Sequence, residues 1–137
     1  MADSPADQDL ADRYRAYLAL CNAHAFDQIG AYVAENVVVN DSVRGLAAYI
    51  SGLRAVVASF PDYHWDLRRL VVNRPLAAAQ LVDTGTHTGA DFLGVPAGDR
   101  RVRVPEFAVY AWSGGLIQEV WTATDRLDVL EQLREEG

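Results

Sequence analysis

The stretch RRVRVPEFAVYAWSGGLIQEVWTAT, residues 100–124, has the pattern of a long β-hairpin. Residues 100–112 and 116–124 are rich in β-branched and aromatic side chains that alternate with polar ones, which is typical of strands. The Ser-Gly-Gly sequence at 113–115 between them is a turn signal, because glycine adopts backbone conformations that other residues avoid. The stretch therefore predicts two long antiparallel strands joined by a tight turn.

The same alternation extends toward the N-terminus as far as Pro61. Residues 63–73 and 76–88 are predicted to form two further strands, with Arg74-Pro75 as the turn between them. The segment 89–99 is rich in glycine and proline and is predicted to be a loop. The second half of the chain is thus a run of four long strands.

Outside this run, apolar residues recur at helical spacing. Ser4 followed by Pro5 and Asp7 is a typical helix start, because the Ser4 side chain can accept a hydrogen bond from a free backbone N–H. The other predicted elements are a helix over 4–23, a short helix over 26–33, a short strand over 37–39, a helix over 46–59 and a closing helix over 125–133.

This order of elements predicts an α+β fold, in which a cone-shaped, curved antiparallel sheet packs around three N-terminal helices. Such a sheet leaves an internal pocket whose mouth can hold a small ligand. A length of 137 residues with 50% hydrophobic residues is enough for one core, so we expect a single domain over residues 1–137.

Composition excludes several classes of function. The net charge is −7, whereas nucleic-acid binders usually carry a basic face, so no nucleic-acid partner is expected. All 12 basic residues are arginine, so no side chain can form the Schiff base of lysine-imine or pyridoxal-phosphate enzymes. Cys21 is the single cysteine, so neither an intrachain disulfide nor a cysteine zinc site can form. The histidines are scattered, and we expect no metal and no cofactor.

Residues 1–10 are acidic and polar and do not resemble a secretion signal. No apolar run approaches the roughly 18 residues that span a bilayer. We therefore expect a cytoplasmic protein without membrane contact.

Asp125, at the end of the last predicted strand, is the first candidate for chemistry. If the alternation is unbroken, it shares a strand face with Glu119 and Trp121. A carboxyl group beside a Trp in a poorly hydrated pocket has a raised pKa and can transfer protons near neutral pH. The alternative is that Asp125 caps the helix that follows it.

The other candidates are single polar residues within apolar strands. His87 can orient or protonate a substrate oxygen, or it can only bond a backbone carbonyl. His64 can be a half-exposed strand residue, and Asn40 can be a turn residue or lie at a pocket rim. Glu106 is the single acid in its strand, and a cross-strand ion pair with an arginine would explain it. The aromatic residues belong to the core by default, although some could line a pocket.

Six motifs occur in an order that resembles a known family. They are Phe60-Pro61-Asp62, 85–89 (GTHTG), 92–96 (FLGVP), 101–105 (RVRVP), 115–121 (GLIQEVW) and Asp125-Arg126-Leu127. The chain resembles the SnoaL-like polyketide cyclases of the nuclear transport factor 2-like superfamily over nearly its whole length. The cone fold implied by this resemblance agrees with the pattern of elements.

The resemblance implies a cofactor-free and metal-free enzyme that closes a ring by intramolecular aldol addition on a hydrophobic, polyketide-like substrate. Asp125 matches the acid/base residue of these cyclases, and His87 matches an assisting histidine. Asp125 would remove a proton from carbon, His87 and Asn40 would stabilise the enolate, and Asp125 would return the proton to the new alkoxide. The residues expected to contact substrate are Asn40, His64, Trp65, Phe107, Trp121 and Tyr14.

Three alternatives remain open at this stage. Ketosteroid isomerases and epoxide hydrolases share the cone but use other carboxylate arrangements, and a second acid such as Asp41 or Glu106 near Asp125 would favour hydrolysis. A non-catalytic binding or dimerisation module would have a filled cone, with no cavity of at least a few hundred Å³. A homodimer is expected in either case, through an apolar sheet face to which we assign Val109, Tyr110 and Trp112.

Overall fold

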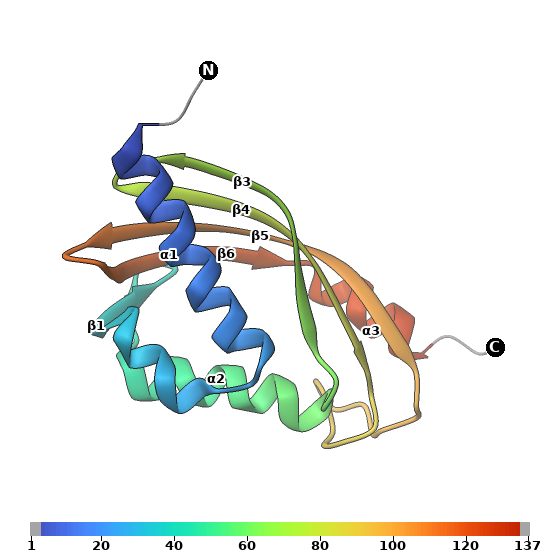
Figure 1. Cartoon of the computed structure of the whole chain (residues 1–137). Coiled ribbons are helices and arrows are strands. Elements are labelled where there is room, and N and C mark those ends of the chain that lie inside the picture. The colour runs from blue at the N-terminus through green and yellow to red at the C-terminus, as the bar shows by residue number, and fades with distance from the viewer. Residues whose placement is uncertain (1–3, 135–137) are drawn as a thin grey trace.

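A computed structural model describes residues 4–134, which form helices and one sheet (Figure 1). The helical elements are α1 (Pro5–Asn22), the 3-10 helix η1 (Phe26–Ala31), α2 (Leu46–Ser59) and α3 (Arg126–Arg134). The strands are β1 (Val33–Val39), β2 (Ser42–Val43), β3 (His64–Asn73), β4 (Leu76–Thr86), β5 (Arg101–Ser113) and β6 (Leu116–Thr124). The predicted α+β class is confirmed, and α2 and β6 have the bounds predicted from sequence.

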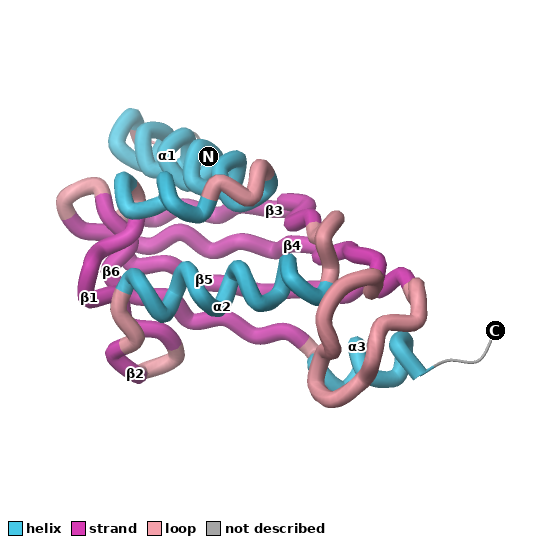
Figure 2. The backbone as a smooth tube through the Cα atoms, turned by 90° about the horizontal axis from the view of Figure 1, so that it is seen from below, coloured by secondary structure: helices cyan, strands magenta, loops and turns pink. Residues whose placement is uncertain are grey.

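The six strands form one curved, unclosed sheet in the order β2-β1-β6-β5-β4-β3. Neighbouring strands are antiparallel, except that β1 runs parallel to β6, with Val38 opposite Glu119 and Val39 opposite Val120. The sequence predicted a fully antiparallel sheet, but β1, besides forming a short hairpin with β2, pairs in parallel with β6, which lies far away in the chain. Helices α1 and α2 lie on the concave face, where α2 runs along the direction of the strands (Figure 2).

The start of α1 is fixed as predicted, because Ser4 Oγ accepts a hydrogen bond from the Asp7 backbone N–H at 3.1 Å and Pro5 occupies the first turn. The core lies between the helices and the concave face. Its fully buried members include Tyr14 and Ile29 from the helical segments and Leu81 and Val104 from the sheet. Among residues 4–134, no helix has both the length and the apolar composition needed to cross a membrane.

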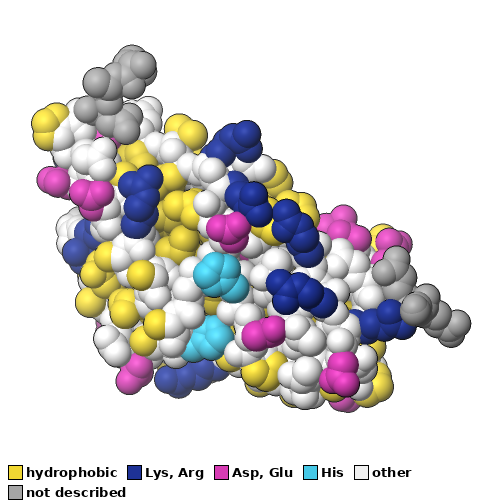
Figure 3. All heavy atoms as spheres, turned by 45° about the vertical axis from the view of Figure 1, so that its right-hand side comes forward, with side chains coloured by type: hydrophobic (Ala, Val, Ile, Leu, Met, Phe, Trp, Pro, Cys, Tyr) yellow, Lys and Arg dark blue, Asp and Glu magenta, His cyan; other side chains and the backbone are white. Residues whose placement is uncertain are grey.

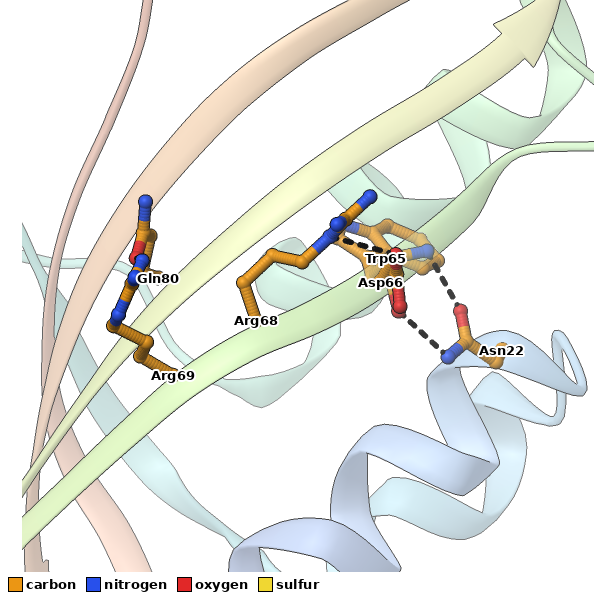
Figure 4. Close-up of polar contacts among 6 residues, drawn as sticks. All are labelled: Asn22, Trp65, Asp66, Arg68, Arg69 and Gln80. Carbon is orange, nitrogen blue, oxygen red and sulfur yellow. Dashed lines mark hydrogen bonds and ion pairs between the residues drawn. The ribbon is translucent and has the colours of Figure 1, made fainter.

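The end of α1 is attached to edge strand β3 by Asn22 (Figure 4). Its Nδ2 donates to the Trp65 carbonyl at 2.9 Å, and its Oδ1 accepts from the Trp65 N–H at 2.8 Å. On the same strand Asp66 pairs with Arg68 at 2.9 Å, and Arg69 donates to Gln80 at 2.7 Å. Asn22 therefore satisfies two backbone groups of an edge strand that has no further strand beside it.

Asn22→Ala is expected to destabilise the fold by about 1–3 kcal/mol, because both Trp65 backbone groups lose a part-buried partner. The measurement is the urea unfolding midpoint at constant slope. Asn36→Ala, at an exposed position of β1, serves as the control and is expected to change the midpoint little. Equal shifts for the two variants would show that the Asn22 attachment contributes nothing.

Candidate active site

Asp125 lies on the surface and caps α3. Its Oδ1 accepts a hydrogen bond from the Asp128 N–H at 3.0 Å, and its side chain is exposed. Sequence analysis expected it in an enclosed pocket on the face of Glu119 and Trp121, and this placement is wrong. That face points away from the helices, and Trp121 bonds there to Asp41 Oδ1 at 3.3 Å. Of the two roles left open for Asp125, the structure shows the helix cap.

His87 is buried and holds the loop that follows β4. One ring nitrogen, Nε2, lies 2.8 Å from the Ala90 carbonyl, and the ring packs on Phe60 with centroids 5.1 Å apart. Its backbone N–H donates to Arg100 and its carbonyl accepts from Asp99, which ties the two ends of the loop together. The structure thus shows the backbone-bonding alternative for His87.

The residues expected at the substrate divide between the two sides of the sheet. Tyr14 and Trp65 are buried on the concave side. Phe107 and Trp121 lie on the convex side with 57% and 37% of their surface exposed, and His64 is exposed as well. Asn40 is an exposed residue whose Nδ2 and Oδ1 bond the backbone of Thr122. The structure therefore brings two of these six residues into the interior.

The polar centre of the concave face is a pair of acids, Asp83 on β4 and Glu106 on β5. Asp83 is 1% exposed, and its Oδ2 accepts a hydrogen bond from the Tyr63 hydroxyl at 2.8 Å. Glu106 Oε2 accepts from the Thr122 hydroxyl at 2.8 Å. In the β4–β5 register Asp83 lies opposite Val104 and Glu106 opposite Leu81, so the two acids are diagonal neighbours on the buried face. We call these two residues the acid pair.

The acid pair holds a proton. The pKa of Asp83 is raised to about 9: burial is the largest cause, a hydrogen bond with Glu106 and the Glu106 charge also raise it, and the Tyr63 hydroxyl lowers it. Among residues 4–134, no donor reaches Asp83 Oδ1. A carboxyl group can bond to another carboxyl group only if one of them is protonated. At neutral pH Asp83 is therefore a neutral acid beside Glu106.

Two small cavities lie on either side of the acid pair. One, of about 150 Å³, is lined by apolar side chains together with Tyr63, Thr124 and Arg126. The other, of about 50 Å³, is lined by Glu106, Trp65 and the Tyr17 and Tyr49 hydroxyls, which lie 2.6 Å apart. Glu106 borders one cavity, and Tyr63, which bonds Asp83, borders the other. Glu106 is therefore the member of the pair that lines a cavity, whereas Asp83 is linked to the other cavity through the Tyr63 hydroxyl.

Other reactive groups are less suited to chemistry. Burial raises the pKa of the Cys21 thiol to about 12, against a smaller opposing effect of Tyr17, so the thiol stays protonated and is a poor nucleophile at neutral pH. Three larger depressions, of about 540, 300 and 240 Å³, occur elsewhere among residues 4–134, and none is lined by more than one acid. No cluster of three or more metal-ligating side chains occurs in the same part of the chain.

The fold and the enclosed acid pair define a cone-shaped α+β protein with a polar centre inside an apolar interior. The family model of the SnoaL-like polyketide cyclases matches residues 11–133, and the chain belongs to this family. A search of curated proteins found no match.

Solved structures support the assignment. A SnoaL-like polyketide cyclase from Agrobacterium tumefaciens is 33% identical, with a TM-score of 0.80, and the match covers 90% of this chain and 97% of that one. IdmH from Streptomyces antibioticus, a proposed polyketide cyclase, is 22% identical, with a TM-score of 0.80 and coverages of 90% and 96%. AclR from Streptomyces galilaeus, a proposed hydroxylase, is 17% identical, with a TM-score of 0.84 and coverages of 96% and 86%. The last two matches show the shared fold alone, and a shared fold does not fix the reaction.

Proposed function

We propose that this protein is a cofactor-free enzyme that closes a ring on a hydrophobic, polyketide-like molecule by intramolecular aldol addition. The acid pair is the observation that carries the proposal, because burial keeps the Asp83 carboxyl group protonated and the Glu106 carboxyl group lies diagonally beside it on the buried face. Paired carboxyl groups in different protonation states are suited to general acid and base catalysis. We assign the catalytic roles to Glu106 and Asp83 in place of Asp125 and His87.

In the proposed mechanism, Glu106 takes a proton from a carbon next to a carbonyl, and the C–H electron pair becomes the enolate. The enolate carbon forms a bond to a second carbonyl carbon of the same molecule, and the π electrons of that carbonyl move to its oxygen. Asp83 gives its proton to the resulting alkoxide. Transfer of the proton from Glu106 to Asp83 then restores the starting state, so protons and electrons balance.

The surroundings of the pair support these roles. Thr122 and Tyr63 each donate to one carboxyl oxygen and hold the two groups in place. The Tyr17 and Tyr49 hydroxyls border the Glu106 cavity and can donate to an enolate oxygen. Burial raises the pKa of Tyr49 above its usual value. This hydroxyl is therefore a neutral donor at neutral pH.

Heptane-2,6-dione is a direct probe of this proposal, because its C1 can attack C6 to give a six-membered hydroxyketone. Nuclear magnetic resonance in D2O follows both exchange at C1 and ring closure. Exchange with closure, above the buffer rate, is expected. Exchange without closure would instead favour an isomerase-like proton transfer, which shares the first step. The absence of both would overturn the enzymatic proposal.

A non-catalytic ligand-binding module is the second candidate function. It is favoured by the small size of the cavities beside the acid pair, about 150 and 50 Å³, which are both below the lower end of ordinary ligand sites, roughly 300 Å³. Under this candidate the acid pair is a structural feature, and the diketone neither exchanges nor closes.

We also propose that the protein forms a homodimer through the convex face of the sheet. Tyr110 and Trp112 belong to the core rather than to this surface, because they point toward the helices. Phe107, Val71 and Trp121 are exposed apolar residues on the convex side, and Phe107 and Val71 border a shallow depression that also includes Val109. An exposed apolar face of this kind is suited to an isologous contact. The side of the molecule in Figure 3 shows basic side chains interspersed with acidic and hydrophobic ones.

Phe107→Asp is expected to convert a dimer of about twice the chain mass into a 15.0 kDa monomer, because it places a charge in the centre of the apolar face. Light scattering after size exclusion gives the mass. Leu127→Asp, at an exposed position of α3, is the control and is expected to stay dimeric. A monomeric wild-type chain would refute this interface.

A further inference from the structure

The larger cavity beside the acid pair has mostly apolar walls and one charged residue in its lining. Phe60, Phe92 and Val104 contribute to the walls, Tyr63 connects the cavity to the acid pair, and Arg126 is the single charged residue of the lining. Its volume of about 150 Å³ accommodates a single benzene-sized ring. The cavity therefore has the size of one ring and is lined both by a hydroxyl that bonds the acid pair and by a guanidinium.

Arg126 is placed where it contributes little to stability. It is the first residue of α3, and a cation in the first turn is disfavoured by the positive end of the helix dipole. Among residues 4–134, no acidic side chain pairs with its guanidinium. The nearby acids are engaged elsewhere, because Asp125 caps the helix and Asp128 accepts from Gln132. The guanidinium is thus free to meet an anion, although the chain as a whole carries a net charge of −7.

We infer that the cavity takes a small carboxylate, with one ring or an equivalent short carbon chain between the apolar walls and its acid group on Arg126. Arg126 is then a specificity-determining residue, since a guanidinium binds a carboxylate through two parallel hydrogen bonds. That the opposite end of the ligand is the reacting end rests on the proposed function of the acid pair. A ligand with several fused rings exceeds this cavity.

Two probes of the same shape test the inference, namely 3-phenylpropanoate and its neutral amide, titrated into the full chain by calorimetry. Wild type is expected to bind the acid about tenfold more tightly than the amide. Arg126→Gln is expected to remove this preference and leave the affinity for the amide unchanged. Arg134→Gln removes the same charge at an exposed position of the same helix and is expected to keep the preference.

Three results would overturn the inference. These are equal binding of acid and amide by wild type, an intact preference in Arg126→Gln, and equally tight binding of anthracene-9-carboxylate. The thermal midpoint of each variant shows that it is folded. Because these titrations do not depend on turnover, a preference for the acid without closure of heptane-2,6-dione would support the ligand class while refuting the catalytic proposal. Closure of heptane-2,6-dione without a preference for the acid would support the catalytic proposal and refute the ligand class.

Discussion

Glu106→Gln is expected to lower the rates of proton exchange and ring closure by about a thousandfold, the effect of removing a positioned general base. Glutamine has nearly the same shape, and its side-chain carbonyl can still accept the Thr122 hydrogen bond, so the fold is expected to persist. An amide oxygen cannot take up a proton from carbon at neutral pH. The rates are measured by nuclear magnetic resonance with heptane-2,6-dione as the probe.

Two control variants make the assignment specific. Glu119→Gln removes an acid from the adjacent strand β6 and is expected to leave the rate unchanged, because this residue shares the strand face of Trp121, away from the helices. Asp125→Asn keeps a good helix cap and is also expected to leave the rate unchanged. A loss of activity in Asp125→Asn together with normal rates in Glu106→Gln would return the catalytic role to Asp125.

Asp83→Asn is expected to make the stability of the protein less dependent on pH. Burial and Glu106 raise the pKa of Asp83 in the folded state to about 9, whereas an unfolded Asp titrates near 4. The folded state therefore binds the proton more tightly, and the wild type loses stability as the pH rises from about 4 to about 9. Asparagine resembles the protonated acid, since its Oδ1 can accept from Tyr63 and its amide can donate to Glu106.

Between about pH 5 and pH 8, the wild type is expected to lose on the order of 3 kcal/mol of unfolding free energy relative to Asp83→Asn. Urea unfolding at a series of pH values measures it. Asp99→Asn, an exposed loop variant, is the control and is expected to follow the wild type. A constant difference across the pH range would contradict the protonated state assigned to Asp83.

The acid pair could have been found in the sequence from strand periodicity. Asp83 lies an even number of positions from Ala77, Ala79 and Leu81, all of which are buried, so it shares their strand face. Glu106 shares a strand face with buried Val104 and Ala108 in the same way. The sequence drew attention to Glu106, but a cross-strand ion pair with an arginine was the explanation offered for it, with Arg100, Arg101 and Arg103 nearby in the chain. Arg101 and Arg103 have the opposite parity and are exposed, so they cannot reach it. Periodicity places an acid on one face of its strand, but it does not identify which residue of the neighbouring strand lies beside it.

The placement of Asp125 shows what periodicity alone does not decide. Alternation correctly grouped residues 119 and 121, but the inner residues of β6 are those of the opposite parity, Val120 and Thr122. Asp125 also lies beyond the end of the strand, where the backbone has begun α3. Successive residues of a strand point to opposite faces. An error of one position in choosing the inner face therefore predicts an interior location for a residue that lies on the surface, as Asp125 does.

Local sequence determined the elements of this protein, since glycine and proline turns, the Ser4 cap and the change from helical to strand periodicity act over a few residues. These signals placed α2, β6 and the strand run correctly. Only the tertiary structure decided which sheet face the helices cover, the parallel pairing of β1 with β6 and the meeting of Asp83 with Glu106. The reason is physical: burial of one sheet face and the desolvation of a carboxyl group depend on contacts between segments far apart in the chain.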